Sequence, residues 1–163
     1  MIGIDLPGPD ATLRLGAALG SGWPRGRPRA LALHLQGELG AGKTTLAQGL
    51  IGALGVAGTI RSPSYSLLEV YPTGAGTVVV HADFYRLHGG EELEALGWRD
   101  YCVEGVLQVV EWPGNAGAAL PAPDLRIQLA VQGAGRHARL EALSAAGSAW
   151  LEASGITAAS ASI

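Results

Sequence analysis

Gly37-Glu38-Leu39-Gly40-Ala41-Gly42-Lys43-Thr44 carries the strongest structural signal in this 163-residue chain. It matches the pattern G-x-x-x-x-G-K-[ST], whose glycines let backbone N–H groups turn inward around phosphate oxygens. The apolar run Ala30 to Leu35 precedes it as an expected buried strand, and Lys43 to Leu54 has a helical pattern. A phosphate-binding loop between a strand and a helix predicts an α/β domain that binds a nucleoside triphosphate.

Lys43 is the only lysine among the eleven Lys and Arg residues of the chain. Lysine is a compact point charge on a flexible stem, and some phosphate sites need it rather than the planar fork of arginine. We expect Lys43 to reach the β- and γ-phosphates and the Thr44 hydroxyl to ligate Mg²⁺. The alternative is a glycine-rich turn that binds nothing, but the motif, its flanking elements and the unique lysine all argue against it.

Two acidic residues follow apolar strands and are candidates for metal binding or for orienting an attacking water. Asp83 comes after the expected strand Thr77 to His81, and Glu111 follows the apolar run Val106 to Val110. Either could instead be a helix cap or a surface charge. The loop before them favours a functional role for both, and the sequence alone does not divide the two roles between them.

Three further features near these acids have both a functional and a structural interpretation. Ser64, in Ser62-Pro63-Ser64-Tyr65, either touches magnesium or phosphate or belongs to a proline-fixed turn. Trp112 either lies near the nucleotide or packs in the core. His81 and Asp83 have H-x-D spacing, which is too little for a zinc site without further ligands.

The remaining pattern predicts a single domain over residues 1–143 and an Ala/Ser-rich tail over residues 144–163, with a short helix near Trp150. Short helices are expected at Thr12 to Leu19 and Glu91 to Leu96, and a hairpin at Leu125 to Val131 and His137 to Leu143.

Composition narrows the function classes. The net charge of −3 does not suggest a general nucleic-acid binder. Cys102 is the only cysteine, so no internal disulfide can form, which is compatible with a reducing cytosol. The sequence has no uninterrupted apolar stretch long enough to predict a membrane span. Met1 to Asp10 lacks the features of a secretory signal.

The nucleotide is inferred by elimination. Common guanine-specific GTPases use an N-K-x-D box, but Asn115 is the only asparagine and no lysine follows Lys43. The strand lysine of protein kinases is absent for the same reason. Adenine is therefore the favoured base.

From about Thr12 to Leu143, the chain resembles the TsaE family, also called YjeE, of bacterial P-loop ATPases. The resemblance rests on ordered blocks, of which the later ones are the more specific. These blocks are Gly37 to Thr45, Ser62-Pro63-Ser64-Tyr65, His81-Ala82-Asp83-Phe84-Tyr85-Arg86-Leu87, Leu96-Gly97 and Glu111-Trp112-Pro113.

The resemblance implies a three-layer P-loop NTPase fold of the α/β class with a mixed parallel and antiparallel central sheet. ATP and Mg²⁺ would be the cofactors, with Thr44 and Glu111 on the magnesium side and Lys43, Asp83 and Glu111 as catalytic residues. Trp112 matches a nucleotide-proximal tryptophan. The nucleotide-contacting set would be Glu38, Leu39, Gly40, Ala41, Gly42, Lys43, Thr44, Thr45, Ser64 and Trp112.

The resemblance also implies partners and a pathway. The family's ATP hydrolysis supports repeated turnover of a TsaD–TsaB complex, which makes threonylcarbamoyladenosine at adenosine 37 of tRNA. A member of the family would act on that cytoplasmic complex, meet tRNA through it, and not perform the transfer itself.

Two positions depart from the family pattern, and two other functions remain open. Ser64 stands where threonine is usual, and Phe84 where a smaller aliphatic residue is usual. A small-molecule kinase of the shikimate or nucleoside type would also be short, but Arg86 and Arg99 are scattered and form no lid cluster. A nucleotide-sensing module without hydrolysis would not need both Asp83 and Glu111.

Overall fold

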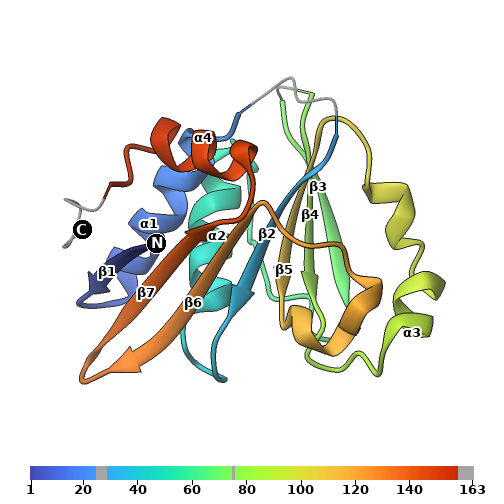
Figure 1. Cartoon of the computed structure of the whole chain (residues 1–163), viewed down its shortest axis with the longest axis horizontal. Helices are drawn as coiled ribbons and strands as arrows, with labels where there is room; N and C mark the ends of the chain where they lie inside the picture. Colours follow the sequence, from blue (N-terminus) through green and yellow to red (C-terminus); the bar gives the residue numbers. More distant parts are fainter. Residues whose placement is uncertain (25–28, 75, 158–163) are drawn as a thin grey trace.

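The computed structural model of the chain describes residues 1–24, 29–74 and 76–157. Within these residues, seven strands form one sheet in the order β1-β7-β6-β2-β5-β4-β3 (Figure 1). The strands are β1 (Ile2–Leu6), β2 (Leu31–Gln36), β3 (Leu68–Pro72), β4 (Val78–Asp83), β5 (Val106–Glu111), β6 (Leu125–Gln132) and β7 (Gly135–Ala142).

The centre of the sheet is parallel and its margins are antiparallel. β2 runs parallel to both β5 and β6, and β4 runs parallel to β5. β3, β7 and β1 each pair antiparallel with their neighbours. The central strands are almost wholly buried, as expected for apolar runs covered on both faces. The expected α/β class with a mixed sheet is confirmed.

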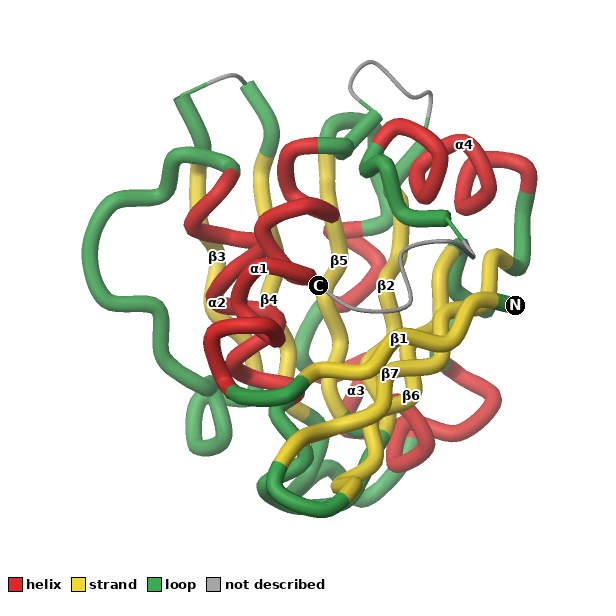
Figure 2. The backbone as a smooth tube through the Cα atoms, turned by 90° about the vertical axis from the view of Figure 1, so that its left-hand side faces the viewer, coloured by secondary structure: helices red, strands yellow, loops and turns green. Residues whose placement is uncertain are grey.

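Helices cover both faces of this sheet, which makes three layers (Figures 1 and 2). One core joins the sheet to α1 (Pro9–Ser21), α2 (Lys43–Ala53) and α4 (Ala145–Ala153). A second core, on the other face, contains residues of α3 (Gly90–Ala95) and of the 3₁₀ segments η1 (Trp98–Tyr101) and η2 (Pro113–Ala119). Among the described residues, no helix has the length and apolar character needed to cross a bilayer.

Glycines bring α1 and α2 into close contact. A side chain at Gly16 of α1 would collide with the carbonyl oxygen of Leu46, and one at Gly49 of α2 would collide with that of Leu13. Absence of a Cβ is what allows the two backbones to approach so closely. The helix that follows the glycine-rich loop is therefore held firmly against its neighbour.

Two terminal elements complete the core. β1 is an addition to the elements expected from the sequence, and its Ile4 and Leu6 are buried. In α4, Trp150 is fully buried and its indole N–H donates to the carbonyl of Leu19, 2.8 Å away. The tail that follows residue 143 thus begins with a helix packed into the main core, and its residues 158–163 lie outside the described part of the chain.

Candidate functional site

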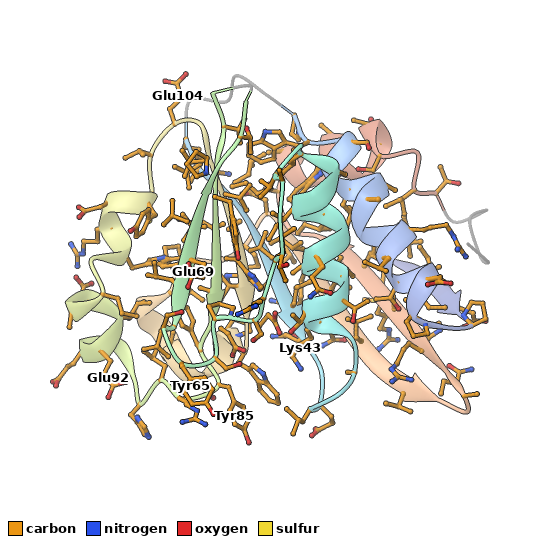
Figure 3. All side chains as sticks on the ribbon, turned by 180° about the vertical axis from the view of Figure 1, so that it is seen from behind. Lys43, Tyr65, Glu69, Tyr85, Glu92 and Glu104 are labelled. Atoms are coloured by element: carbon orange, nitrogen blue, oxygen red, sulfur yellow. The ribbon has the colours of Figure 1, made fainter. Side chains whose placement is uncertain are left out.

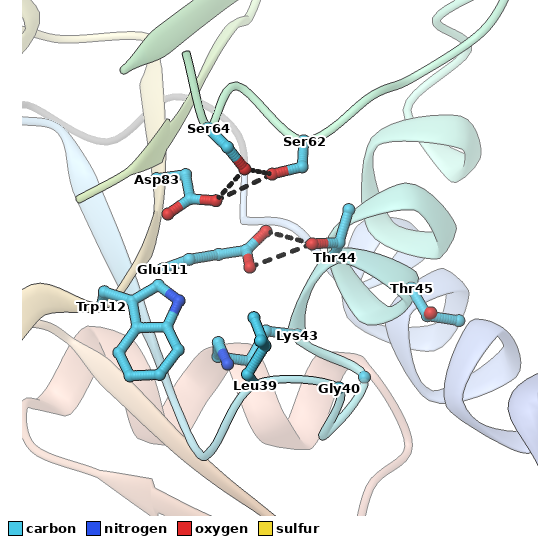
Figure 4. A pocket seen from close by; sticks show the side chains of 11 residues that line it. Leu39, Gly40, Lys43, Thr44, Thr45, Ser62, Ser64, Asp83, Glu111 and Trp112 are labelled. Atoms are coloured by element: carbon cyan, nitrogen blue, oxygen red, sulfur yellow. Dashed lines mark hydrogen bonds between the residues drawn. The ribbon is translucent and has the colours of Figure 1, made fainter. Parts of the chain in front are cut away.

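A cavity of about 330 Å³ opens at the carboxyl end of β2, β4 and β5. This edge of a parallel sheet is where α/β proteins bind ligands, because loops leave the strands there in different directions. Figure 3 places Lys43, Tyr65 and Tyr85 at the same end of the molecule. The lining residues are Leu39, Gly40, Gly42, Lys43, Thr44, Thr45, Ser62, Ser64, Asp83, Glu111 and Trp112 (Figure 4).

The glycine-rich loop adopts a backbone path that only glycine follows easily. Gly40 has φ of 78° and Gly42 has φ of 103°, in the left-handed region that penalises a Cβ. Gly42 precedes the first residue of α2, and no described side chain caps that helix end. The first-turn N–H groups of α2 therefore remain available at the cavity, where the helix dipole favours negative charge.

Lys43 is held inside the loop. Its Nζ atom donates to the carbonyl oxygens of Gly37 at 2.7 Å and Glu38 at 2.8 Å. The same ammonium lies 4.1 Å from the centre of the Trp112 ring. Burial lowers the pKa of Lys43, although the charges of Glu111, Asp83 and Glu38 act in the opposite direction. The lysine is thus a nearly enclosed cation, with 5% of its surface exposed.

Glu111 connects the loop helix to the end of β5. The Thr44 hydroxyl lies 3.0 Å from Oε1 and 3.1 Å from Oε2 of Glu111, and donates to this carboxylate (Figure 4). His81 Nε2 lies 2.9 Å from the same Oε1. The Glu111 side chain is 3% exposed, so its orientation is determined by these two neighbours.

Asp83 lies next to Glu111 in the paired ends of β4 and β5. Its Oδ2 accepts hydrogen bonds from the hydroxyls of Ser62 at 2.8 Å and Ser64 at 2.9 Å (Figure 4). Its Oδ1 accepts from the backbone N–H of Tyr85 at 3.0 Å. The loop that contains both serines is therefore fastened to the carboxylate from above the cavity.

Trp112 borders the cavity in a strained backbone conformation. Its φ of 56° is in the left-handed region, which is costly for a bulky side chain. The ring packs at 5.0 Å, centre to centre, against Tyr85 on one side and lies under Lys43 on another. The strained backbone at Trp112, next to Glu111, thus holds the indole between Lys43 and the exposed ring of Tyr85.

A smaller hollow of about 80 Å³ adjoins the loop on the side away from the two carboxylates. It lies between the start of α1 and Arg136 of β7, and it shares Gly40, Gly42 and Thr45 with the larger cavity. Arg136 Nη2 donates to the carbonyl of Gly40 at 3.1 Å. The β6–β7 hairpin therefore contacts the glycine-rich loop directly.

The predicted site residues converge with two exceptions. The side chain of Glu38 is exposed and only its carbonyl joins the site, through Lys43, while Ala41 is buried in the core. Sequence reasoning did not identify Ser62, His81 or Arg136 as contacts. The H-x-D spacing of His81 and Asp83 is too little for zinc, but it does indicate that both side chains face the site, because alternate residues of a strand face the same side.

The acidic groups suit a magnesium ion that takes most ligands from phosphate and water. In the described part of the chain, no group of three or more His, Cys, Asp and Glu residues could hold a metal alone. Two buried carboxylates, Asp83 and Glu111, nevertheless line one cavity with the buried cation Lys43. Mg²⁺ is commonly bound by one or two carboxylates together with substrate phosphates.

A family model and several curated relatives agree on one family. The model of "Threonylcarbamoyl adenosine biosynthesis protein TsaE" matches residues 6–139. The proteins called tRNA threonylcarbamoyladenosine biosynthesis protein TsaE include one from Haemophilus influenzae, 40% identical over 101 residues, which are 62% of this chain and 63% of that one. The protein of that name from Mycobacterium tuberculosis strain H37Rv is 37% identical over 132 residues, 76% of either chain.

A third relative with the same name, from Streptomyces coelicolor, is 43% identical over 97 residues, 58% of this chain and 65% of that one. The chain thus matches just under two thirds of the length of the Haemophilus and Streptomyces proteins. The crystal structure of YdiB from Bacillus subtilis superposes with a TM-score of 0.68 at 24% identity, covering 94% of this chain and 93% of that one. This likeness shows a shared fold.

Proposed function

The chain belongs to the TsaE family, and from this premise we propose that it binds ATP with Mg²⁺ and hydrolyses the ATP in support of tRNA N6-threonylcarbamoyladenosine synthesis. In this proposal it acts on a TsaD–TsaB complex, which transfers threonylcarbamoyl to adenosine 37, and it does not catalyse the transfer. It meets tRNA through that complex, in the cytoplasm, where tRNA is modified.

The observation that carries the proposal is the convergence of Lys43, Thr44, Asp83 and Glu111 on one cavity. They come from the start of α2 and from the ends of β4 and β5, so the fold brings together residues up to 68 positions apart in sequence (43 to 111). A binding loop alone would need only the first two. The two buried carboxylates support hydrolysis because phosphoryl transfer requires positioning of a metal and of a water.

Phosphate binding would use the loop backbone and Lys43. N–H groups of the loop and of the first turn of α2 would donate to phosphate oxygens. Lys43 would exchange its two carbonyl acceptors, Gly37 and Glu38, for the β- and γ-phosphates. The ammonium lies over the Trp112 ring, 4.1 Å from its centre, and the indole would limit the access of water to it.

Thr44 and Glu111 would hold the metal side of the site. Mg²⁺, when bound, neutralises charge that develops on the phosphates. Glu111 suits this role because no lysine or arginine within the described residues forms an ion pair with it, and its neighbours are Thr44 and His81. The Thr44 hydroxyl can donate to Glu111 while its oxygen lone pair faces a cation.

Asp83 would orient the attacking water. Its carboxylate is kept in place by Ser62, Ser64 and the N–H of Tyr85, so its remaining lone pairs have a defined direction. This assigns metal binding to Glu111 and water orientation to Asp83. Ser64 retains the hydroxyl that the usual threonine of the family would supply.

The test is phosphate release by purified protein with and without TsaD–TsaB, together with tRNA modification in a reconstituted system. We expect slow release alone and faster release with the partners. Lys43→Ala should reduce both activities by about 100-fold or more, as loss of one charge-stabilising donor commonly does. Arg99→Ala is the matched control, because Arg99 is an exposed cation paired with Glu94 far from the cavity.

Three outcomes would contradict the proposal. Full ATP-dependent modification by Lys43→Ala would remove the need for this site. A phosphorylated small molecule formed from labelled ATP and a metabolite panel would favour a kinase. Nucleotide binding without phosphate release, even with both partners present, would favour a sensing module.

A further inference from the structure

His81 of β4 is a buried histidine whose one polar partner among the described residues is the Glu111 carboxylate. Its side chain is 0% exposed and Nε2 lies 2.9 Å from Oε1 of Glu111. Its other ring nitrogen, Nδ1, is buried and has no hydrogen-bond partner among the described residues. Burying a histidine for packing alone is unfavourable, because both polar ring nitrogens would need hydrogen-bond partners. The contact with Glu111 therefore indicates a role beyond packing.

Strand geometry explains why this contact forms. Successive side chains of a strand alternate between faces, so His81 lies on the same face of β4 as Asp83. Glu111 and Val109 share the corresponding face of β5, and His81 pairs with Val109 while Asp83 pairs with Glu111. His81 is therefore placed diagonally beneath Glu111, one step inside the cavity edge.

The tautomer follows from the surroundings of the two ring nitrogens. Oε1 of Glu111 can only accept, so the proton of the contact is on Nε2. Nδ1 faces no described acceptor, so a proton there would be buried without a partner at a cost. The arrangement therefore fits an imidazole that donates from Nε2 to the carboxylate and has no proton on Nδ1.

We propose that His81 is a positioning residue, which holds the Glu111 carboxylate so that its free lone pairs face the magnesium position. Thr44 shares one hydroxyl proton between both oxygens and cannot alone fix the plane of the carboxylate. The donor of His81 fixes Oε1 and leaves Oε2 directed at the cavity. The inference rests on the proposed function and concerns the metal side of that site.

The test compares two amides that place a donor differently. The amide nitrogen of glutamine can occupy the position of Nε2, whereas that of asparagine ends near the position of Nδ1 and does not reach Glu111. Mn²⁺, a paramagnetic substitute for Mg²⁺, is titrated by EPR into each full-length variant saturated with a non-hydrolysable ATP analogue. Thermal midpoints without metal show whether each variant is folded.

We expect His81→Asn to bind Mn²⁺ at least about 10-fold more weakly, as loss of the hydrogen bonds that orient metal ligands commonly does. His81→Gln should stay within about threefold of the unaltered protein, and both variants should bind the metal-free analogue normally. If His81→Asn does not fold, His81→Met, which has no donor, takes its place with the same expected loss.

Equal Mn²⁺ affinity in all folded variants would overturn the positioning role. An equal loss in His81→Gln and in the variant that lacks the donor would also overturn it, because shape rather than the donor would then matter. Failure of the unaltered protein to bind Mn²⁺ beyond what the nucleotide alone binds would overturn the proposed function, and this inference with it.

Discussion

At the scale of single residues, His34 in β2 is a buried group whose surroundings oppose its charged form. Burial lowers its pKa to about 4, and the positive charge of Arg126, its partner on β6, acts in the same direction. Its Nε2 has no hydrogen-bond partner among the described residues. The folded protein therefore holds this imidazole neutral at pH values where an unfolded chain would protonate it.

The sign of the resulting pH dependence follows from this lowered pKa. The contribution of His34 to stability is complete above about pH 6.5 and is lost as the pH falls towards about 4, because the unfolded chain takes up the proton first. We expect this loss to approach about 3 kcal/mol in the free energy of unfolding. Urea unfolding at several pH values measures it, and His34→Gln should flatten the dependence; an unchanged slope would contradict the assignment.

The hydroxyl of Ser64 leads to a second prediction at the scale of single residues, on the rate of phosphate release. Ser64→Ala removes one of two hydroxyl donors to Oδ2 of Asp83 and leaves the donor of Ser62. A hydrogen bond to a charged group contributes about 1.5 kcal/mol at the low end, so partner-stimulated phosphate release should fall about 10-fold. Ser64→Thr keeps the hydroxyl and should retain most of the rate. Equal rates for the alanine and threonine variants would show that this donor is dispensable.

Residues of a local motif could be predicted, as could the two acids that follow apolar strands, Asp83 and Glu111, whereas the neighbours that hold these acids in place could not. Lys43 and Thr44 are recognisable because the loop pattern prescribes them within eight consecutive positions. Ser62 and His81 become site residues only when β4 lies beside β5 and the preceding loop folds over Asp83. That pairing depends on contacts distant in sequence, which spacing along one chain does not specify.

At the scale of elements, the contact between α1 and α2 leads to a stability prediction. Gly49→Ala would drive a methyl group into the carbonyl of Leu13, so the helices would have to separate. We expect a loss of about 1–3 kcal/mol, the usual cost of overpacking. Gly52→Ala is the matched control, because Gly52 lies on the exposed side of the same helix with no atom near its would-be Cβ.

The control should stabilise the protein by about 0.5–1 kcal/mol, since alanine is the better helix former. Thermal or denaturant unfolding of both variants measures the difference. If Gly49→Ala were as stable as Gly52→Ala, the two helices would not be in such close contact. Nucleotide affinity should fall with Gly49→Ala as well, because α2 begins at Lys43.

The elements with a clear apolar pattern, either a continuous run, an alternation or helical spacing, were the ones that could be predicted. β2, β5 and the body of α2 lie close to their expected ranges, as does the hairpin of β6 and β7. β1 differs because it has five residues, two of them Gly3 and Asp5, and it exists by pairing with β7. A short edge strand has a weak signal of its own, and its partner lies more than a hundred residues away.

At the scale of the whole molecule, Asp124 joins three separate parts of the chain. It is 2% exposed and accepts hydrogen bonds from Arg29 at 2.6 Å, from the Ser144 hydroxyl at 2.6 Å, and from the N–H of Ala32 at 3.0 Å. Burial by itself would raise the pKa of Asp124, but these bonds outweigh it and lower the pKa. The start of β2 and the start of α4 are thereby tied to the start of β6.

Asp124→Asn should lower the free energy of unfolding near neutral pH by about 2 kcal/mol, because a charged acceptor is lost from a buried network. The stabilisation by Asp124 is present above the unfolded pKa of about 3.9 and is lost as the pH falls through the lower folded pKa. The difference between the two proteins should therefore narrow below about pH 4. Asp100→Asn, at an exposed position, is the control and should show no such trend.

The order of strands in the sheet could not be predicted from spacing. A mixed sheet was expected from the resemblance to a family, yet nothing local in Leu125 to Gln132 indicates that β6 lies beside β2 rather than beside β5. The burial of Leu125 and Ile127 with Leu33 and Leu35 in one core accounts for the placement. Such packing is decided between distant segments and is visible only when the chain is assembled.

Lys43 makes the protein unusual as a target for amine chemistry. Since no other lysine occurs in the sequence, the chain offers acylating reagents one side-chain amine besides its N-terminus. Lys43 is 5% exposed and its amine donates to two carbonyls, so a reagent gains access only when the loop opens, and a bound nucleotide would shield the amine. The extent of acylation at Lys43, measured by mass spectrometry of the intact protein, therefore reports the fraction of molecules whose loop is occupied by a ligand.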